Sequence, residues 1–408
     1  MCPGVRAECA VGSPSVARQG LGLGAARAAG QLVMVVVFAV IARMAGVERV
    51  GFVTSAVAIA TFLSGLVDFG AGSFWVREYA SGRLSAAEFR SRSGGKVVAG
   101  TLLATVVMVG NLFDFSPTLI VGAALLLISS VLSQTYQVVL VAAREAKSLI
   151  VLAVIERLAL AFVFFLLVTL VGVAPEFAFY YGYLAGSLVF CALAARRMPM
   201  LRPSLQGLSW RSTWKGSGHF GLSKAIISLQ ATDVLLGATV GGPAVAGVYG
   251  AVARWTMPIT LLTNSFVTML TPNIAAAVDR KDTWRGLRGS LWLPGVTLVA
   301  AAVVLIFSKP AVLIILGKEF ESSVPVLQLL VVAAALSSCA QVAISVLQAR
   351  RREKVVSVAL GGAVGIQLSL VVPLVHALGA TGLAVAAVVG QALLCAALAG
   401  ATLRILRN

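Results

Sequence analysis

The chain has 408 residues, of which 59% are hydrophobic and 12% are charged. A soluble domain carries about a quarter charged residues, so this composition excludes an ordinary soluble enzyme. The formal net charge of +17 is spread in short clusters between apolar stretches, with no basic domain, which argues against nucleic-acid binding and favours a membrane protein with charged loops.

Apolar stretches of about twenty residues, the length that crosses ~30 Å of hydrocarbon, recur along the whole chain. They show no alternation with a period of two, which excludes a transmembrane barrel. The first six predicted spans are 21–42, 50–68, 96–113, 117–142, 150–173 and 177–194. The next six are 218–239, 245–272, 289–316, 323–348, 355–375 and 379–402. The predicted fold is an all-α polytopic membrane protein of about twelve transmembrane helices.

The distribution of basic residues predicts the orientation of these spans. Of the 32 Lys and Arg residues, 24 fall on the side of the N-terminus and four on the other side, alternating loop by loop. The four on the other side are Arg43, Arg49, Lys309 and Lys318. The four inside spans are Arg27, Arg157, Lys224 and Arg254. Because basic loops stay inside, both termini are predicted to be cytoplasmic, in an inner membrane.

A basic linker at 196–217 is predicted to divide the chain into two six-helix halves, 1–195 and 218–408. The halves share a weak repeat. Gly46 and Gly51 precede the second span as Gly242 and Gly247 precede the eighth, with an offset of 196 in both pairs. The same offset carries Arg27 to the residue beside Lys224. Two parallel repeats with a substrate site between them are typical of alternating-access transporters.

The segment 42–78, ARMAGVERVGFVTSAVAIATFLSGLVDFGAGSFWVRE, resembles the polysaccharide flippases of the multidrug/oligosaccharidyl-lipid/polysaccharide exporter (MOP) superfamily. Those proteins commonly show an R-x-G-x-x-x-x-G turn between helices one and two, then D-[FY]-G and an Arg. Here Gly46 and Gly51 supply the turn, with Arg43 one residue early. Asp68, Phe69, Gly70 and Arg77 supply the rest, and GVYGAVARW (247–255) is the similar stretch in the second half.

This resemblance implies a flippase that moves undecaprenyl-diphosphate-linked oligosaccharide repeat units from the cytoplasmic to the periplasmic leaflet, for cell-surface polysaccharide biosynthesis. It also implies polysaccharide polymerases and glycosyltransferases as partners, beside membrane lipids. The alternative within the superfamily is a multidrug or cation antiporter. Such a site favours carboxylates, whereas the spans hold four cations against Glu156 and Asp233. A major-facilitator transporter shares the twelve helices, but DFGAGSFWVRE mimics its loop motif loosely.

Four charged residues inside spans are predicted to bind substrate: Arg27, Lys224, Arg254 and Asp233. Arg27 and Lys224 lie at similar shallow depths from the cytoplasmic edge, where both suit a diphosphate, although side chains so placed also snorkel to headgroups. Arg254 lies deeper, as a midmembrane anion site or as the partner of Asp233 in a buried ion pair. Because Lys224 and Asp233 point 180° apart on an ideal helix, both face one cavity only if the seventh helix kinks.

The other polar residues in spans have structural explanations of equal or greater weight. Glu156 and Arg157 are predicted to pair with neighbouring helices or the basic loop before them. Asp68 and Arg77 are predicted to fix the loop between helices two and three. Gln134, Tyr136, Gln137 and Gln230 suit either sugar hydroxyls or contacts between helices.

No pattern in the chain points to an enzyme, a metal or a cofactor. The five cysteines have no C-x-x-C spacing, and the two histidines, His219 and His376, are far apart. A membrane-bound polysaccharide polymerase is the alternative of a different class. Those enzymes generally need a large outer loop with catalytic carboxylates, and the predicted outer loops are short. A nucleotide-binding motif, which an ATP-driven pump needs, is also missing.

Overall fold

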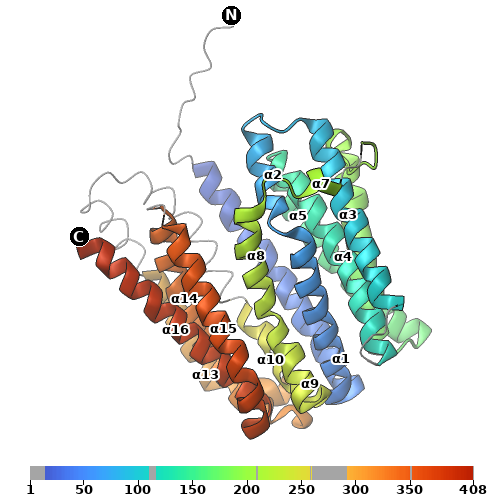
Figure 1. Cartoon of the computed structure of the whole chain (residues 1–408). Coiled ribbons are helices and arrows are strands. Elements are labelled where there is room, and N and C mark those ends of the chain that lie inside the picture. Colours follow the sequence, from blue (N-terminus) through green and yellow to red (C-terminus); the bar gives the residue numbers. More distant parts are fainter. Residues whose placement is uncertain are drawn as a thin grey trace, which may run out of the picture.

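The computed structural model describes residues 14–109, 116–207, 210–257, 259, 292–349 and 352–407. Within these ranges the chain is helical apart from short turns, and Figure 1 shows the helices lying roughly side by side. Nine of the described helices are long and apolar enough to cross a membrane, and the first of them holds two spans. The protein is therefore a multi-pass membrane protein, and the predicted fold class is confirmed.

The N-terminal half follows the predicted spans closely. Its elements are α1 (Pro14–Asp68), α2 (Ala71–Ala80), α3 (Ala86–Val109), α4 (Pro117–Ala142), α5 (Ala146–Leu166) with η1 (Leu167–Val171), and α6 (Pro175–Arg197). Local signals explain where α4 and α6 begin. Both helices have proline in their first turn, where no backbone donor is needed, and the Ser116 hydroxyl accepts from the Leu119 N–H to cap α4.

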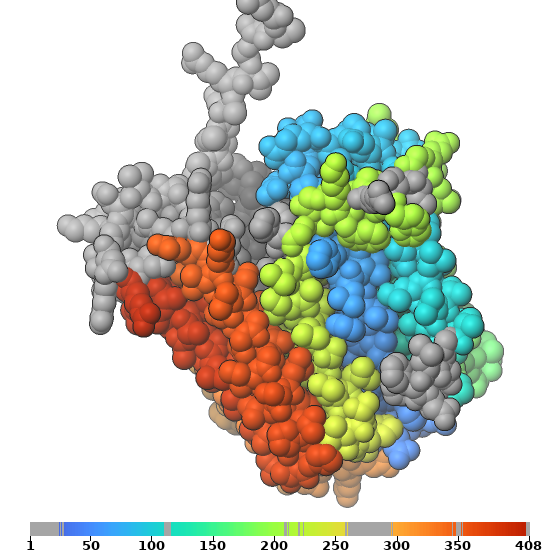
Figure 2. Space-filling view, in the orientation of Figure 1, coloured from blue at the N-terminus to red at the C-terminus, as the bar shows by residue number. Residues whose placement is uncertain are grey.

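The C-terminal half follows two short linker elements, η2 (Pro199–Leu201) and α7 (Trp210–Thr213). Its own elements are α8 (Gly218–Gln230), α9 (Thr232–Gly241), α10 (Pro243–Ala253), η3 (Arg254–Thr256), α13 (Trp292–Ile315), η4 (Lys318–Phe320), α14 (Ser323–Ala349), α15 (Glu353–Leu378) and α16 (Ala380–Arg407). Together α8 and α9 form the seventh predicted span. The predicted spans 245–272 and 289–316 lie partly outside the described residues. Figure 2 shows α8–α10 between the N-terminal half and the last helices of the C-terminal half on the face in view.

The two glycine turns found by their common offset have the same backbone geometry. Gly46, which breaks α1 into two helices, has φ 76° and ψ −179°, and Gly242 has φ 85° and ψ 170°. This left-handed region suits glycine, because a side chain would clash with the backbone. The two turns related by the offset of 196 thus share one backbone conformation, as an internal repeat predicts.

The second glycines of the two motifs bring the halves into close contact. A Cβ atom on Gly51 would lie 1.9 Å from the Pro243 carbonyl oxygen, and one on Gly247 would lie 2.1 Å from that of Val47. Since Val47 and Pro243 are also separated by 196 residues, each motif packs against its counterpart. The backbones of α1 and α10 approach closely at this end of the molecule, predicted to be the outer one, only because neither glycine has a side chain.

Arg43, the basic residue of the first turn, ties the same end of the interface to α13. Its Nε donates to the Ile315 carbonyl over 2.9 Å, and its Nη2 donates to the Ile314 carbonyl. These carbonyls lie at the C-terminal end of α13, where they have no partner within the helix and the helix dipole favours a cation. Arg43 therefore acts here in packing the two halves together.

At the opposite end, predicted to be cytoplasmic, the region between the second and third spans lies against the basic linker. The Trp75 indole donates to the Thr213 carbonyl over 3.2 Å, and the Ser204 N–H donates to the Arg90 carbonyl over 2.9 Å. Figure 1 shows α2 and α7 at this end and the turn of α1 at the other. The linker 196–217 therefore packs on α2 and α3 of the N-terminal half.

The third predicted span, 96–113, begins with Lys96, which would put this residue at the cytoplasmic edge. In the structure α3 begins ten residues earlier, at Ala86, so this expectation for Lys96 was wrong. Ser85 and Glu88 form a reciprocal capping box that starts the helix there. Lys96 consequently lies within the helix with no exposed surface, and its Nζ donates to Asp68 over 2.5 Å. Asp68 thus has the structural role expected of it, with Lys96 as its partner.

Candidate functional site

The seventh span is broken between Lys224 and Asp233. The break is at Ala231, between α8 and α9, and no proline is present. Instead, side chains bond to the local backbone: the Thr232 hydroxyl donates to the Leu229 carbonyl over 2.7 Å, and the Val234 N–H donates to the Asp233 carboxylate over 2.6 Å. Such bonds compete with the regular helical ladder. The regular helix is thus interrupted between Lys224 and Asp233, at the place where a kink would be needed for both to face one cavity.

Asp233 lies at the start of α9, buried among neutral polar groups. Its carboxylate accepts from Gln367 Nε2 of α15 over 3.0 Å and from the Tyr249 hydroxyl of α10 over 3.5 Å. Gln230 of α8 donates in turn to the Gln367 side-chain oxygen over 3.1 Å. In the part of the chain that the structure describes, Asp233 forms no ion pair with Arg254, so the expected pair between helices seven and eight is not seen.

Arg254 begins η3, directly after α10, and is half-buried. Its guanidinium carbon lies 4.0 Å from the centroid of the Phe38 ring, which belongs to the first helix of α1. A cation over an aromatic face is favourable, and more so away from water. This contact crosses from the C-terminal half to the N-terminal half, so Arg254 lies at their interface.

Arg157 of α5 lies on the N-terminal side of this interface. It is eleven residues from Ala146, the first residue of α5, which at 1.5 Å per residue places it about 17 Å into the helix. Its guanidinium lies 5.0 Å from the Tyr183 ring centroid and donates to the Tyr183 hydroxyl over 3.4 Å. The Tyr183 ring packs on Phe179, and Phe179 packs on the Phe38 ring that Arg254 contacts. A chain of three aromatic rings thus links the two arginines across the interface.

The carboxylate next to Arg157 in the sequence is held elsewhere. Glu156 is buried and accepts from the Ser133 hydroxyl of α4 over 2.5 Å and from the Ser187 hydroxyl of α6 over 3.4 Å. Both residues thus contact neighbouring helices, as expected for them. The two side chains point about 100° apart on α5, so they contact different neighbours.

The two arginines and their aromatic partners form a cationic cluster, defined here as Arg157, Arg254, Tyr183 and Phe38. Within the described residues, no carboxylate forms a salt bridge with either guanidinium. A charge at this depth is costly and normally faces a partner or a water-filled cavity. Guanidinium groups bind phosphate and carboxylate oxygens in pairs, so the arrangement suits an anion that reaches the interface between the halves.

The remaining predicted site residues lie toward the end that is predicted to be cytoplasmic. Lys224 is half-buried in α8 and within electrostatic range of Lys96. Arg27 lies on α1, with its side chain outside the described residues. Of the polar residues considered for sugar binding, Gln134 donates to the Ser64 hydroxyl over 3.3 Å, and Gln230 belongs to the Asp233 network. The structure therefore links Asp233 and Gln230 through Gln367 and places Arg254 against Phe38 at the interface between the halves.

No family model matches the sequence, and no curated protein matches it. Solved structures do. An inward-facing multidrug resistance MATE family transporter of the MOP superfamily matches with a TM-score of 0.74 at 13% identity, covering 93% of this chain and 94% of that one. The chain has the fold of these transporters.

Two further structures with this fold sharpen the comparison. An outward-facing multidrug resistance MATE family transporter has a TM-score of 0.58 at 14% identity, over 97% of this chain and 96% of the other. A MOP superfamily transporter from Pyrococcus furiosus, described as having a binding pocket of reverse polarity that suggests a different function, has a TM-score of 0.64 at 15% identity over 98% of both chains. The structure is thus more similar to the inward-facing transporter than to the outward-facing one.

Proposed function

We propose that the protein is an alternating-access membrane transporter whose substrate is an anion. The fold supports the transport part of this proposal, because solved structures with the same arrangement of helices are transporters. The supporting geometry is the meeting of two halves at opposed glycine motifs on the outer end and at the cationic cluster deeper in the membrane. A substrate held between two such halves is released when they rock.

The observation that carries the anionic substrate is the cationic cluster itself. Arg157 and Arg254 come from opposite halves, and in the described chain they contact aromatic rings and no carboxylate. A diphosphate is the ligand that two guanidinium groups bind best. Together with the resemblance of segment 42–78, this favours an undecaprenyl-diphosphate-linked oligosaccharide, flipped from the cytoplasmic to the periplasmic leaflet of a bacterial inner membrane. Arg27 and Lys224 are then proposed to attract the diphosphate at the cytoplasmic end.

The second candidate function is a multidrug or cation antiporter, and it has its own support. Matching solved structures are named as multidrug or MATE transporters, so the similarity of fold favours this candidate over the flippase. The specific observation in this chain is Asp233, a buried carboxylate held by neutral groups, whose charge is free to be neutralised by a proton or a cation. The cationic cluster argues against a cationic drug at the interface.

The deciding experiment compares lipid-linked sugars with drug efflux in the same strains. Cells carry the native chain, the Arg157→Gln/Arg254→Gln variant, a Lys309→Gln control or no copy, at equal membrane expression. Lys309 is an exposed cation on the other side of the membrane, paired with Glu321 over 3.2 Å. Undecaprenyl-linked sugars on the cytoplasmic leaflet are quantified by mass spectrometry, and efflux of a cationic dye is followed by fluorescence.

The flippase proposal expects the deletion and the double variant to trap intact repeat units, and the control to behave as the native chain. If the deletion traps them and the double variant does not, the flippase stands and the cationic cluster is not its site. If neither changes lipid-linked sugars while the deletion abolishes dye efflux, the antiporter is the correct function.

A further inference from the structure

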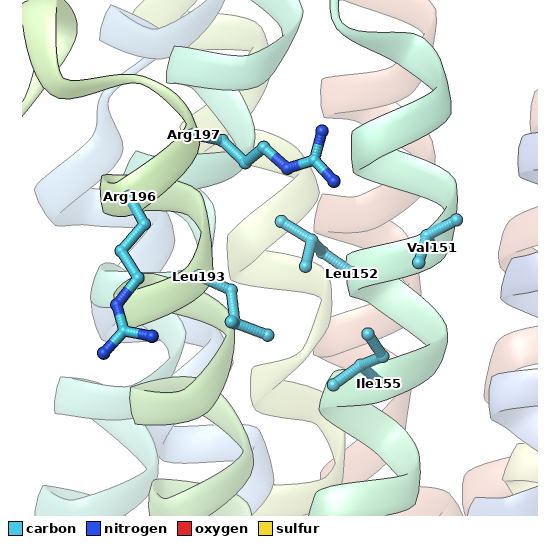
Figure 3. Close-up of a pocket in the computed structure, with 6 residues that line it drawn as sticks. All are labelled: Val151, Leu152, Ile155, Leu193, Arg196 and Arg197. Atoms are coloured by element: carbon cyan, nitrogen blue, oxygen red, sulfur yellow. The ribbon is translucent and has the colours of Figure 1, made fainter.

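A groove lies between α5 and α6, two helices of the N-terminal half, and is lined by residues of this half alone. The cavity has a volume of about 370 Å³ and is lined by Val151, Leu152, Ile155, Leu193, Arg196 and Arg197. Four aliphatic side chains thus share one opening with two arginines. Figure 3 shows Arg197 extending from α6 toward α5, beside Leu152.

The groove results from how α5 and α6 cross. The two helices touch where Gly186 and Gly182 face α5: a Cβ atom on Gly186 would lie 2.5 Å from the Glu156 carbonyl oxygen, and one on Gly182 2.8 Å from that of Leu160. The groove begins about one turn further toward the predicted cytoplasmic end. Its floor is closed, because Leu152 belongs to a buried apolar cluster that includes residues of α4.

The groove is apolar at one end and positively charged at the other, which matches the acyl chain and the phosphate of a phospholipid. Ile155 and Leu193 lie toward the middle of the membrane, whereas Arg196 and Arg197 are the last two residues of α6. Lys147, exposed in the first turn of α5, lies four residues before Val151 and therefore on the same helix face. Within the described chain, neither Arg196 nor Arg197 forms an ion pair with a carboxylate, so both guanidinium groups are available.

The surroundings of the groove are lipid-facing. Val151 is 56% exposed, Leu158 55% and Leu188 50%, and these residues flank the groove on α5 and α6. In a multi-pass protein such an apolar surface is covered by acyl chains. Basic pockets between transmembrane helices on the cytoplasmic side bind anionic headgroups. The ligand must therefore combine an acyl chain with a negative headgroup at one end.

We propose that the groove between α5 and α6 is a binding site for an anionic phospholipid. One acyl chain lies along Leu152, Ile155 and Leu193, and the headgroup phosphate is bound by Arg196 and Arg197. The site is independent of the transported substrate, because it opens to the bilayer on the lipid-facing side of the N-terminal half.

The test uses the purified full chain in detergent and native mass spectrometry, which resolves each bound lipid. The probes are dioleoylphosphatidylglycerol, the zwitterionic dioleoylphosphatidylcholine, and inorganic phosphate as a competitor. The variants are Arg196→Gln/Arg197→Gln, which removes the charges, and Leu193→Trp, which fills the groove and keeps them. The control is Arg352→Gln/Lys354→Gln, which removes two exposed cations at the start of α15, also predicted to be cytoplasmic.

The proposal expects one phosphatidylglycerol to bind at least about tenfold more tightly than phosphatidylcholine, and this preference to disappear in the arginine variant. Leu193→Trp is expected to weaken both lipids, and the control to bind as the native chain does. An equal loss in the control would mean a diffuse charge effect and overturn the site. Full binding by Leu193→Trp would mean that no acyl chain enters the groove, and displacement of the lipid by millimolar phosphate would mean a free-anion site. Each of these results rejects the proposal.

Discussion

Two places within the membrane spans hold cations, and they hold them differently. Lys96 has no exposed surface and forms an ion pair with Asp68 over 2.5 Å, both within the N-terminal half. Arg157 and Arg254 are half-buried, come from different halves, and contact the rings of Tyr183 and Phe38. The first arrangement is complete without a ligand, because each charge neutralises the other. The second leaves positive charge that an anion can neutralise, which is why depth alone does not identify a binding residue.

The largest effect on stability is expected when the complete pair is broken. Lys96→Met leaves Asp68 buried without its partner, which costs about 3–5 kcal/mol of the free energy of unfolding. The expected result is a strong fall in melting temperature and in the yield of monodisperse protein. The control is Lys96→Met combined with Asp68→Asn, which removes both charges and is expected to recover most of the stability. Equal loss in the single and the double variant would contradict the pairing.

A smaller loss of stability is expected at the open arrangement. Arg254→Met keeps an apolar contact with Phe38 and leaves no carboxylate without a partner in the described chain, so the cost is about 0.5–2 kcal/mol, the worth of the cation–ring contact. Binding of a diphosphate probe to the purified protein, measured by calorimetry, is nevertheless expected to weaken at least about tenfold. Destabilisation as large as that of Lys96→Met would mean that Arg254 has a carboxylate partner. The proposed difference between the ion-paired Lys96 and the unpaired Arg254 would then be wrong.

Asp233 tests whether a buried carboxylate among neutral groups belongs to the structure or to transport. In Asp233→Asn the amide still bonds with Gln367 and Tyr249, so stability is expected to change by no more than about 1 kcal/mol. Cation-coupled efflux, if that is the function, is expected to be lost, while binding of a diphosphate probe is retained. Loss of probe binding at unchanged stability would place Asp233 within the anion site. Gln367→Glu, which adds a second carboxylate, is the matched variant that is expected to destabilise the network.

The sequence predicted the framework of the molecule well, because its signals are local. Length and apolar pattern located the spans, and α4 has the bounds expected for it, 117–142. The offset between Gly46 and Gly242 identified turns that share one backbone geometry. Contacts between distant segments were harder to predict. Nothing near Arg157 in the sequence indicates Arg254, and no local pattern shows that Asp233 turns to Gln367, since these partners are 97 and 134 residues away.

The smallest effect is expected at Glu88, a carboxylate that accepts hydrogen bonds, as Asp68 does, but is exposed to water. Glu88 accepts from the N–H and the hydroxyl of Ser85, both over 3.1 Å, at the start of α3. These bonds lower the pKa of Glu88 below its ordinary value of 4.5, with the backbone bond as the largest cause. Glu88→Ala is expected to cost about 0.5 kcal/mol at neutral pH, the low end of a helix cap, because the group is solvated.

The pH dependence of this cap follows from the direction of the shift. Because the folded state binds the Glu88 proton more weakly than the unfolded state, the cap stabilises the protein fully above about pH 4.5 and loses this contribution as the pH falls through the lowered pKa. The difference in melting temperature between the native chain and Glu88→Ala should therefore shrink toward pH 3. Glu88→Gln keeps a capping side chain that does not titrate, so its difference from Glu88→Ala should stay constant. If the difference in melting temperature between the native chain and Glu88→Ala instead grows on acidification, the protonated form of Glu88 stabilises the folded state more than the carboxylate does. That result would contradict the proposed cap.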